Sequence, residues 1–191
     1  MHPDQFTVIN SPDAGIVERS IAELKYHADF LDALGLDETA KIQIHVGGVY
    51  GNKIGAIAAF IQTAVKLPAA IRRRLVIEND DKSFKLVDCL MINLKTGIPI
   101  LFDSFHHACL NNGEPLQLAM KQAIATWKKS DGLMMLDYSS QQPDAIKGTH
   151  IDSIDLADFE KFLKETKGFD FDIMLEIRDK EKSAVKALDA M

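Results

Sequence analysis

Five apolar segments of the sequence each end at or next to a side chain that could bind a metal ion or transfer a proton. The segments are 42–45, 75–78, 98–103, 133–137 and 171–176, and the polar residues at their ends are His45, Glu78, Asp103, Asp137 and Glu176. Imidazole nitrogens and carboxylate oxygens are the ligands that zinc and manganese take in proteins. One such residue alone is more often a helix cap or a loop residue. Five in succession indicate a shared site that holds several metal ions.

Asp103 carries a second signal, because two histidines follow it closely in the sequence Asp103-Ser104-Phe105-His106-His107. The carboxylate and His106 are three positions apart, and both follow directly from an apolar segment. We expect both side chains to project toward the same mouth of the fold as the other segment ends. This doublet strengthens the prediction of a polynuclear metal site.

The five segments have the length and the flanking turn residues of buried parallel strands. Segments with helical periodicity separate them, at 16–34, 53–65, 84–97, 115–127 and 155–167, with a short one from Pro68 and a last one at 180–188. This alternation predicts an α/β fold with a parallel sheet and right-handed crossovers. In a (β/α) barrel the catalytic groups lie where the strands end, so the five polar residues should converge.

The composition is that of an ordinary globular domain. The chain has 191 residues, with 47% hydrophobic and 26% charged residues, and we interpret 1–191 as one domain. No apolar stretch approaches the roughly 20 residues of a membrane span, and no signal peptide is predicted. Cys89 and Cys109 lack the spacing of a metal site or a disulfide framework, which favours a reducing, cytoplasmic setting. The net charge of −6 argues against a strongly cationic surface, although bound cations would reverse the field at an acidic cleft.

A glycine-rich stretch, Val46-Gly47-Gly48-Val49-Tyr50-Gly51, follows His45 directly. Its glycines do not have the spacing of a dinucleotide-binding loop, and it lacks the lysine and hydroxyl residue of a Walker motif. We interpret it as a flexible loop that lines the mouth of the fold and can approach a backbone phosphate closely.

A series of motifs resembles, in order, those of the UV damage endonucleases. They are His2-Pro3-Asp4-Gln5, Ser11-Pro12-Asp13, His45-Val46-Gly47-Gly48 with Tyr50-Gly51, Glu78-Asn79-Asp80, Asp103-Ser104-Phe105-His106-His107, Tyr138-Ser139-Ser140-Gln141, Gly148-Thr149-His150 and Glu176-Ile177-Arg178-Asp179-Lys180-Glu181. The resemblance covers essentially the whole chain. It implies a TIM barrel similar to the endonuclease IV group, with three metal ions at its mouth. It also implies a DNA repair enzyme that nicks damaged duplex DNA immediately 5′ of UV photolesions and other damage.

The resemblance further implies a set of metal ligands, namely His2, His45, Glu78, Asp103, His106, His150 and Glu176. The strand-end pattern adds Asp137, at a place where the family carries Lys-x-His and this chain has Met135-Leu136-Asp137. A carboxylate replaces imidazole more readily for manganese or magnesium than for zinc. Manganese is therefore the expected ion, at up to three sites, with zinc and magnesium as alternatives.

Roles follow from phosphodiester hydrolysis, which needs an activated water and neutralisation of developing negative charge. Glu78 is the expected bridging carboxylate between two ions, and Asp103 and His106 would hold neighbouring ions. Lys180 is a candidate contact to phosphate. The resemblance places Gln5 and Phe6 on a loop that wedges into the damaged helix, and Phe6 stands where the family usually has tyrosine.

Residues that contact the lesion DNA would also include Tyr50 of the glycine-rich loop.

The family barrel has about eight βα units, whereas this chain has five predicted strands and a stub ending at His2. We therefore expect an incomplete barrel that lacks the first two strands and nearly all of the third. Its inner face should be apolar, and its open edges should favour self-association.

Two other interpretations remain open. A TIM barrel with histidines and carboxylates at its mouth also serves sugar isomerases of the xylose type, which bind two divalent ions. Such an enzyme needs lysine and tryptophan near the strand ends, and Trp127 falls within a predicted helix. The third interpretation is an inactive fragment that binds metal weakly or folds by pairing with another copy.

Overall fold

A five-stranded parallel sheet forms the centre of the computed structural model, which describes residues 1–191. The strands lie in sequence order, as β1 (Ile42–His45), β2 (Leu75–Glu78), β3 (Ile100–Asp103), β4 (Met134–Tyr138) and β5 (Phe171–Leu175). Each neighbouring pair is parallel, and β1 and β5 are the two edges of the sheet. The predicted α/β fold with an open, barrel-like sheet is confirmed.

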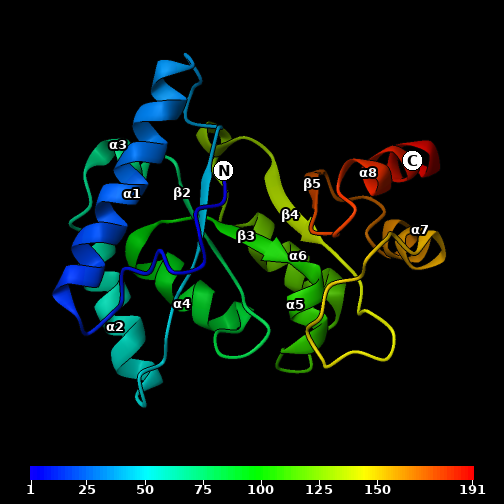
Figure 1. Cartoon of the computed structure of the whole chain (residues 1–191), viewed down its shortest axis with the longest axis horizontal. Helices are drawn as coiled ribbons and strands as arrows, with labels where there is room; N and C mark the ends of the chain where they lie inside the picture. Colours follow the sequence, from blue (N-terminus) through cyan, green and yellow to red (C-terminus); the bar gives the residue numbers. More distant parts are fainter.

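Helices connect the strands and cover one face of the sheet. They are α1 (Ala14–Ala33), α2 (Lys53–Ala64), α3 (Ala69–Arg72), α4 (Leu86–Thr96), α5 (Ser104–Cys109), α6 (Leu116–Ile124), the short 3-10 helix η1 (Lys129–Asp131), α7 (Leu156–Glu165) and α8 (Glu181–Ala190). In Figure 1 they extend from α1 and α2 on the left of the sheet to α7 and α8 on the right. None combines the length and the apolar character that a membrane span requires.

Alternate residues of each strand face the helices and form the core. On β1 and β2 these are Ile42, Ile44, Leu75 and Ile77, which are buried together with helical residues such as Phe60. Because side chains alternate along a strand, the residues between them point to the opposite, inner face. The sheet therefore has one apolar face for stability and a second face whose composition decides what the site can do.

The inner face is polar toward the ends of the strands. The register places His45 beside Glu78 and Glu78 beside Leu101, whereas Asp103 lies beside Asp137, two residues further along β3. Val76 is buried on the same face two residues before Glu78, and Leu101 is buried beside Glu78. The expectation of an apolar inner face is therefore wrong for the layer nearest the mouth, where buried carboxylates replace aliphatic packing.

The two edges of the sheet differ. On β1, the backbone N–H of Gln43 donates to the Met1 carbonyl oxygen at 2.9 Å, and the Met1 amino group donates to the Lys41 carbonyl oxygen at 2.6 Å. The predicted stub before His2 thus lies along this edge. On β5 no strand pairs with the outer side, Asp172 is exposed and the other four residues are half-buried. The prediction of a buried strand is wrong for β5, because it is an edge strand with no neighbouring strand on its outer side.

Helix α5 was not predicted, because it begins directly after β3 with no intervening loop. Asp103 ends the strand and caps the helix at once, since its Oδ1 accepts a hydrogen bond from the His106 amide at 2.7 Å. Successive residues on a helix point about 100° apart. His106 and His107 consequently face different surroundings, although they are adjacent in sequence.

Candidate metal centre

Glu78, at the end of β2, lies at the centre of a group of histidines on the inner face. Its side chain is fully buried, and its Oε2 lies 3.0 Å from His45 Nε2 and 3.6 Å from His2 Nε2. Its Oε1 lies 2.9 Å from His106 Nδ1. The two oxygens of one carboxylate thus face two different sets of ligand atoms, which is the arrangement of a bridging carboxylate.

Three overlapping groups of potential ligands extend from Glu78 across the mouth. In each group the ligand atoms lie within 4.8 Å of one another, and the groups are His2–His45–Glu78, Glu78–Asp103–His106 and Asp103–Asp137–Glu176. Glu78 and Asp103 each belong to two groups. The fold therefore brings together all the predicted ligands except His150 in an array suited to neighbouring cations.

His150 lies beside these groups without belonging to one. Its Nδ1 lies 2.9 Å from the Glu176 carbonyl oxygen and 3.8 Å from Glu176 Oε2. Its ring centroid is 5.6 Å from that of His106. With Nδ1 held by a backbone carbonyl, Nε2 is the nitrogen left for a ligand. Its role as a ligand stays a prediction.

Besides Glu78 Oε1, two buried carboxylate oxygens of the centre lack the hydrogen-bond donors that burial normally demands. Asp103 Oδ2 and Asp137 Oδ1 accept no hydrogen bond, although both residues are completely buried. Removing an ionised carboxylate from water costs several kcal/mol unless a cation or donors compensate. Divalent cations would provide that compensation, and carboxylate and imidazole are suitable donors for them. The residues present therefore fit a metal centre.

The ionisation of the centre is strongly perturbed. Burial raises the pKa of Asp103 to about 8. Burial and the charges of Glu78, Glu176 and Asp103 raise the pKa of Asp137 well above its usual value. Burial opposes ionisation of Glu78 too, but hydrogen bonds from His106, His2 and His45 keep its pKa well below the usual value. Without metal, the centre consequently keeps protons that bound cations would displace.

The pKa of His106 is raised, as are the pKa values of His2 and His45, which also contact Glu78. Burial lowers the pKa of His106, but the hydrogen bond to Glu78 and the charge of Asp103 outweigh that effect and raise the pKa to about 10. Its Nδ1 lies 3.2 Å from Asp103 Oδ2 as well as 2.9 Å from Glu78 Oε1. The same Nδ1 lies 3.0 Å from the Asn79 carbonyl oxygen, so a proton there lies among this oxygen and the two carboxylates that a metal ion would otherwise neutralise.

Two side-chain amides support these ligands, and the strand-end pattern predicts this role for neither of them. The Asn79 side chain donates to the Asp103 carbonyl oxygen at 2.9 Å and accepts from the Asp103 amide at 3.1 Å, which ties the end of β2 to the end of β3. Gln43 Nε2 donates to Glu78 Oε2 at 2.7 Å and to Asp137 Oδ2 at 2.5 Å. Neither residue titrates or ends an apolar segment, so the strand-end pattern gave no signal for them.

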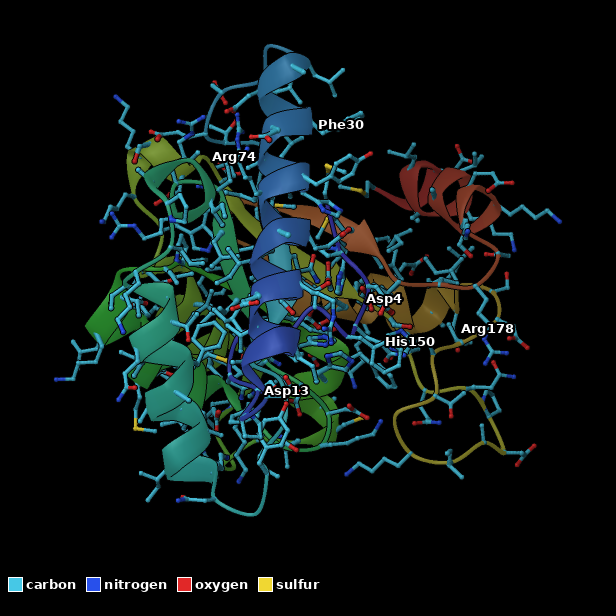
Figure 2. All side chains as sticks on the ribbon, turned by 60° about the vertical axis from the view of Figure 1, so that its left-hand side comes forward. Asp4, Asp13, Phe30, Arg74, His150 and Arg178 are labelled. Carbon is cyan, nitrogen blue, oxygen red and sulfur yellow. The ribbon has the colours of Figure 1, made fainter.

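The predicted wedge residues occupy the tip of a tight turn at the mouth. The Thr7 amide donates to the Asp4 carbonyl oxygen, and the Phe6 amide to Asp4 Oδ1, both at 2.8 Å. Phe6 is 76% exposed. Gln5 lines a cleft of about 410 Å³ together with His45, His106, His150 and Glu176. Figure 2 shows Asp4 and His150 on the same side of the molecule. The turn therefore presents an exposed aromatic ring next to the metal centre.

Tyr50 lies on the glycine-rich loop close to this turn. Its ring covers Gly48 so closely that a Cβ atom on Gly48 would lie 2.7 Å from Tyr50 Cζ. Tyr50 and Phe6 line a common groove of about 660 Å³. The loop thus positions a second aromatic ring at the mouth. Lys180, by contrast, is exposed and lies outside the residues that line the cleft, so its contact to phosphate stays a prediction.

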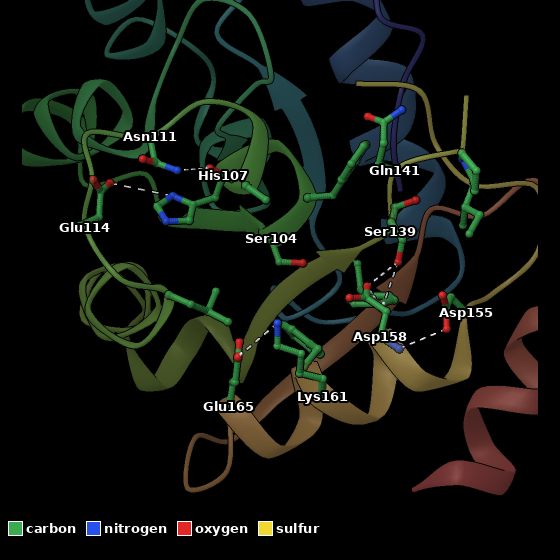
Figure 3. Close-up of a pocket in the computed structure, with 18 residues that line it drawn as sticks. Ser104, His107, Asn111, Glu114, Ser139, Gln141, Asp155, Asp158, Lys161 and Glu165 are labelled. Carbon is green, nitrogen blue, oxygen red and sulfur yellow. Dashed lines mark hydrogen bonds and ion pairs between the residues drawn. The ribbon is translucent and has the colours of Figure 1, made fainter. Parts of the chain in front are cut away.

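A second cavity, of about 590 Å³, lies between α5, the end of β4 and α7 (Figure 3). His107 lines it, with Nδ1 3.9 Å from Glu114 Oε1, and so do Asp158 and Lys161. None of the predicted metal ligands lines this cavity. The two adjacent histidines therefore line different cavities, because His106 lines the cleft at the mouth and His107 does not.

Trp127 does not reach the mouth. Its Nε1 donates at 2.7 Å to the carbonyl oxygen of Ile100, the first residue of β3. The indole is therefore at the end of the sheet opposite the metal centre. A sugar isomerase of the xylose type would need a tryptophan at the strand ends, and Trp127 does not meet that requirement.

Comparison with known proteins places this geometry in context. Residues 1–191 match the sequence model of the family described as UV-endonuclease UvdE. The UV DNA damage endonuclease of Clostridium perfringens is 42% identical over 193 residues, which cover 100% of this chain and 47% of that protein. This chain thus spans about half the length of that relative.

Solved structures agree with the match in sequence. The crystal structure of SacUVDE has a TM-score of 0.93 at 48% identity, covering 99% of this chain and 63% of that one. An L-ribulose 3-epimerase has a TM-score of 0.62 at 16% identity, covering 97% of this chain and 64% of that chain. The second likeness shows the fold alone.

Proposed function

Because this chain belongs to the UV-endonuclease UvdE family, we propose that it is a metal-dependent DNA repair endonuclease that incises damaged duplex DNA 5′ of the lesion. The observation that carries the proposal is the set of three ligand groups linked through Glu78 and Asp103. Such an array suits a reaction in which negative charge develops on several phosphate oxygens at once. Its position beside an exposed aromatic turn suits a distorted duplex as the substrate.

We propose manganese as the metal, held at up to three sites by the groups around Glu78, Asp103 and Asp137, with His150 completing one of them. Bound divalent ions activate water and neutralise phosphate charge. Glu78 would keep two sites at a fixed separation, and Asp103 would do the same for the next pair. Asp137 favours manganese or magnesium over zinc, because carboxylate oxygen is a harder ligand than imidazole nitrogen.

Damage recognition would depend on the mouth loops. A lesion lowers the cost of kinking and unstacking a duplex, so a protein can select it without reading base edges. Phe6 would stack in the opened step, Gln5 would occupy the gap beside it, and Tyr50 would contact the same segment of DNA. Lys180 would contact a phosphate from the far side of the mouth. All four residues are exposed, as contacts to a large ligand require.

We further propose that the open edge of β5 mediates self-association. The outer side of β5 pairs with no strand, and its side chains are only half-buried. Exposed, unprotected strand edges readily pair with another chain. Light scattering over a range of protein concentrations should show a dimer or larger species, and a stable monomer throughout would contradict this proposal.

The central test is nicking of a supercoiled plasmid with and without prior UV irradiation. With manganese we expect conversion of the irradiated plasmid to the open-circle form, little conversion of untreated plasmid, and none with EDTA. Mapping on an end-labelled duplex with a single photolesion should place the break 5′ of the lesion. A chain that binds manganese but leaves irradiated DNA intact would instead support the inactive-fragment interpretation.

A further inference from the structure

Gln43 is a buried, uncharged residue in the middle of β1, two positions before the ligand His45. It is 3% exposed, and it shares the inner face with His45 because side chains alternate along a strand. Its amide nitrogen lies 2.7 Å from Glu78 Oε2 and 2.5 Å from Asp137 Oδ2. A single side-chain amide is therefore shared by two carboxylates from two other strands.

The chemistry of the amide suits this position. A glutamine amide has two N–H groups and can donate one to each carboxylate. An ionised carboxylate only accepts, so once both acids are ionised the nitrogen end must face them. The amide carries no charge, so it does not repel a metal ion held by the other oxygens of the same two carboxylates.

We propose that Gln43 is a positioning residue that determines which oxygen of Glu78 and of Asp137 faces the metal ions. This inference rests on the proposed metal-dependent function. On Asp137, Gln43 occupies Oδ2 and leaves Oδ1, which accepts no hydrogen bond, as the free ligand atom. On Glu78, Gln43 and His45 hold Oε2, so that Oε1 points at His106. Each carboxylate is thereby held in one orientation.

The position of Gln43 in the sheet lets its side chain reach carboxylates on two other strands. β1 and β4 are not neighbours, because β2 and β3 lie between them. The Gln43–Asp137 hydrogen bond therefore spans the open inner face, whereas Glu78 lies on the adjacent strand. The amide fixes the distance between two ligand groups that backbone hydrogen bonds do not connect directly.

A purely structural role makes a different prediction. If Gln43 only satisfies buried acids, its replacement should change the stability of the fold and leave the geometry of bound metal unchanged. If it positions ligands, the affinity and the spectrum of bound manganese should change as well. Loss of a residue that orients metal ligands usually costs about 10- to 100-fold in metal affinity.

The test compares Gln43→Met, which keeps the length of the side chain and removes both donors, with Gln62→Met, since Gln62 is an exposed residue of α2. Manganese binding is measured by titration calorimetry, and the spin coupling between bound ions by electron paramagnetic resonance. We expect Gln43→Met to bind manganese about 10- to 100-fold more weakly, with weakened spin coupling, and Gln62→Met to match the parent chain.

Gln43→Asn provides a second variant, because it keeps the amide but is one methylene shorter and reaches one acid at most. We expect an intermediate loss of affinity, and this variant decides the outcome if Gln43→Met fails to fold. Unchanged affinity and spectrum in a folded variant would overturn the positioning role alone. Absence of manganese binding by the parent chain would overturn the proposed function and this inference together.

Discussion

The two ends of the sheet differ in how their buried charged side chains are paired. Lys41 and Arg74 immediately precede β1 and β2, and His45 and Glu78 end the same two strands. Lys41 Nζ donates to Asp131 Oδ1 at 2.6 Å and to the Arg73 carbonyl oxygen at 3.0 Å. The lysine is 2% exposed, and its charge is fully partnered.

Arg74 is partnered even more completely. Its guanidinium donates to Asp32 and to the carbonyl oxygens of Leu36, Asp37 and Ala40. At the mouth, where the strands end, Asp103 of β3 and Asp137 of β4 are equally buried, but each keeps an oxygen that accepts no hydrogen bond. In Figure 2, Arg74 lies toward the end of α1 that is opposite Asp13. The charges at the closed end of the sheet, where the strands begin, stabilise the fold, whereas those at the mouth are left for a ligand.

Replacement of the central ligand tests this contrast most strongly. Glu78→Gln keeps the shape of the side chain and removes the charge that would bridge two cations. We expect manganese affinity to fall by at least about 100-fold and nicking to disappear, while cooperative unfolding persists. Calorimetry, the plasmid assay and circular dichroism measure the three quantities, and nicking at the parent rate would rule out the bridging role.

Arg74→Met should produce the reverse pattern. It removes a buried charge and leaves three backbone carbonyl oxygens without their donor, which we expect to lower the free energy of unfolding by about 3 kcal/mol. Urea unfolding measures this change. Manganese affinity and nicking per folded molecule should be unchanged. Arg72 of α3 is exposed, and Arg72→Met is the matched control, with an expected change below about 0.5 kcal/mol.

The strand ends could be predicted from sequence, because apolar length and flanking turn residues are local signals. The bounds of β1 and β2 match the prediction, and the others differ by one or two residues. Long-range partners could not be predicted in the same way. Gln43 meets Asp137 across 94 positions of sequence, and the strand pattern assigns its neighbours Ile42 and Ile44 to the core without indicating what faces Gln43.

The same limit applies to the charges at the closed end. Nothing in the local sequence predicts that Lys41 and Arg74 are buried, because their burial depends on the loop 34–41 and on η1. The half-buried state of β5 could not be foreseen either, since its sequence is as apolar as that of the central strands. Burial of a strand depends on what lies beside it, which local periodicity does not encode.

Changes of pH and removal of metal should distinguish the two ends of the sheet by smaller effects on stability. Asp103, with a pKa of about 8, and His106, with a pKa of about 10, bind protons more tightly in the folded chain than in the unfolded one. Their contribution to stability is therefore complete at low pH and is lost as pH rises through those values. The lowered pKa of Glu78 acts in the opposite direction, but below about pH 4.5.

For the metal-free chain we therefore expect the unfolding temperature to fall between about pH 4.5 and about pH 10, most steeply between about pH 6.5 and about pH 8. Metal binds the deprotonated ligands, so stabilisation by manganese should increase over the same range. At a free concentration 100 times the dissociation constant it should reach about 2.7 kcal/mol. Thermal unfolding with EDTA and with manganese measures both, and a pH-independent difference between the two would contradict displacement of protons from the centre.

Phe6→Ala should have the smallest effect, because Phe6 touches neither the core nor the metal ligands. Its ring is 76% exposed, so we expect a change in stability below about 0.5 kcal/mol and unchanged manganese affinity. Stacking of one base on an aromatic ring contributes about 1 to 3 kcal/mol. Near the lower limit, this predicts about a 5-fold loss of nicking on irradiated plasmid. Phe6→Tyr keeps the ring and should nick at close to the parent rate. Phe30→Ala, at a half-exposed ring on α1, controls for loss of a surface aromatic, and an equal loss of nicking there would remove the special role of the turn.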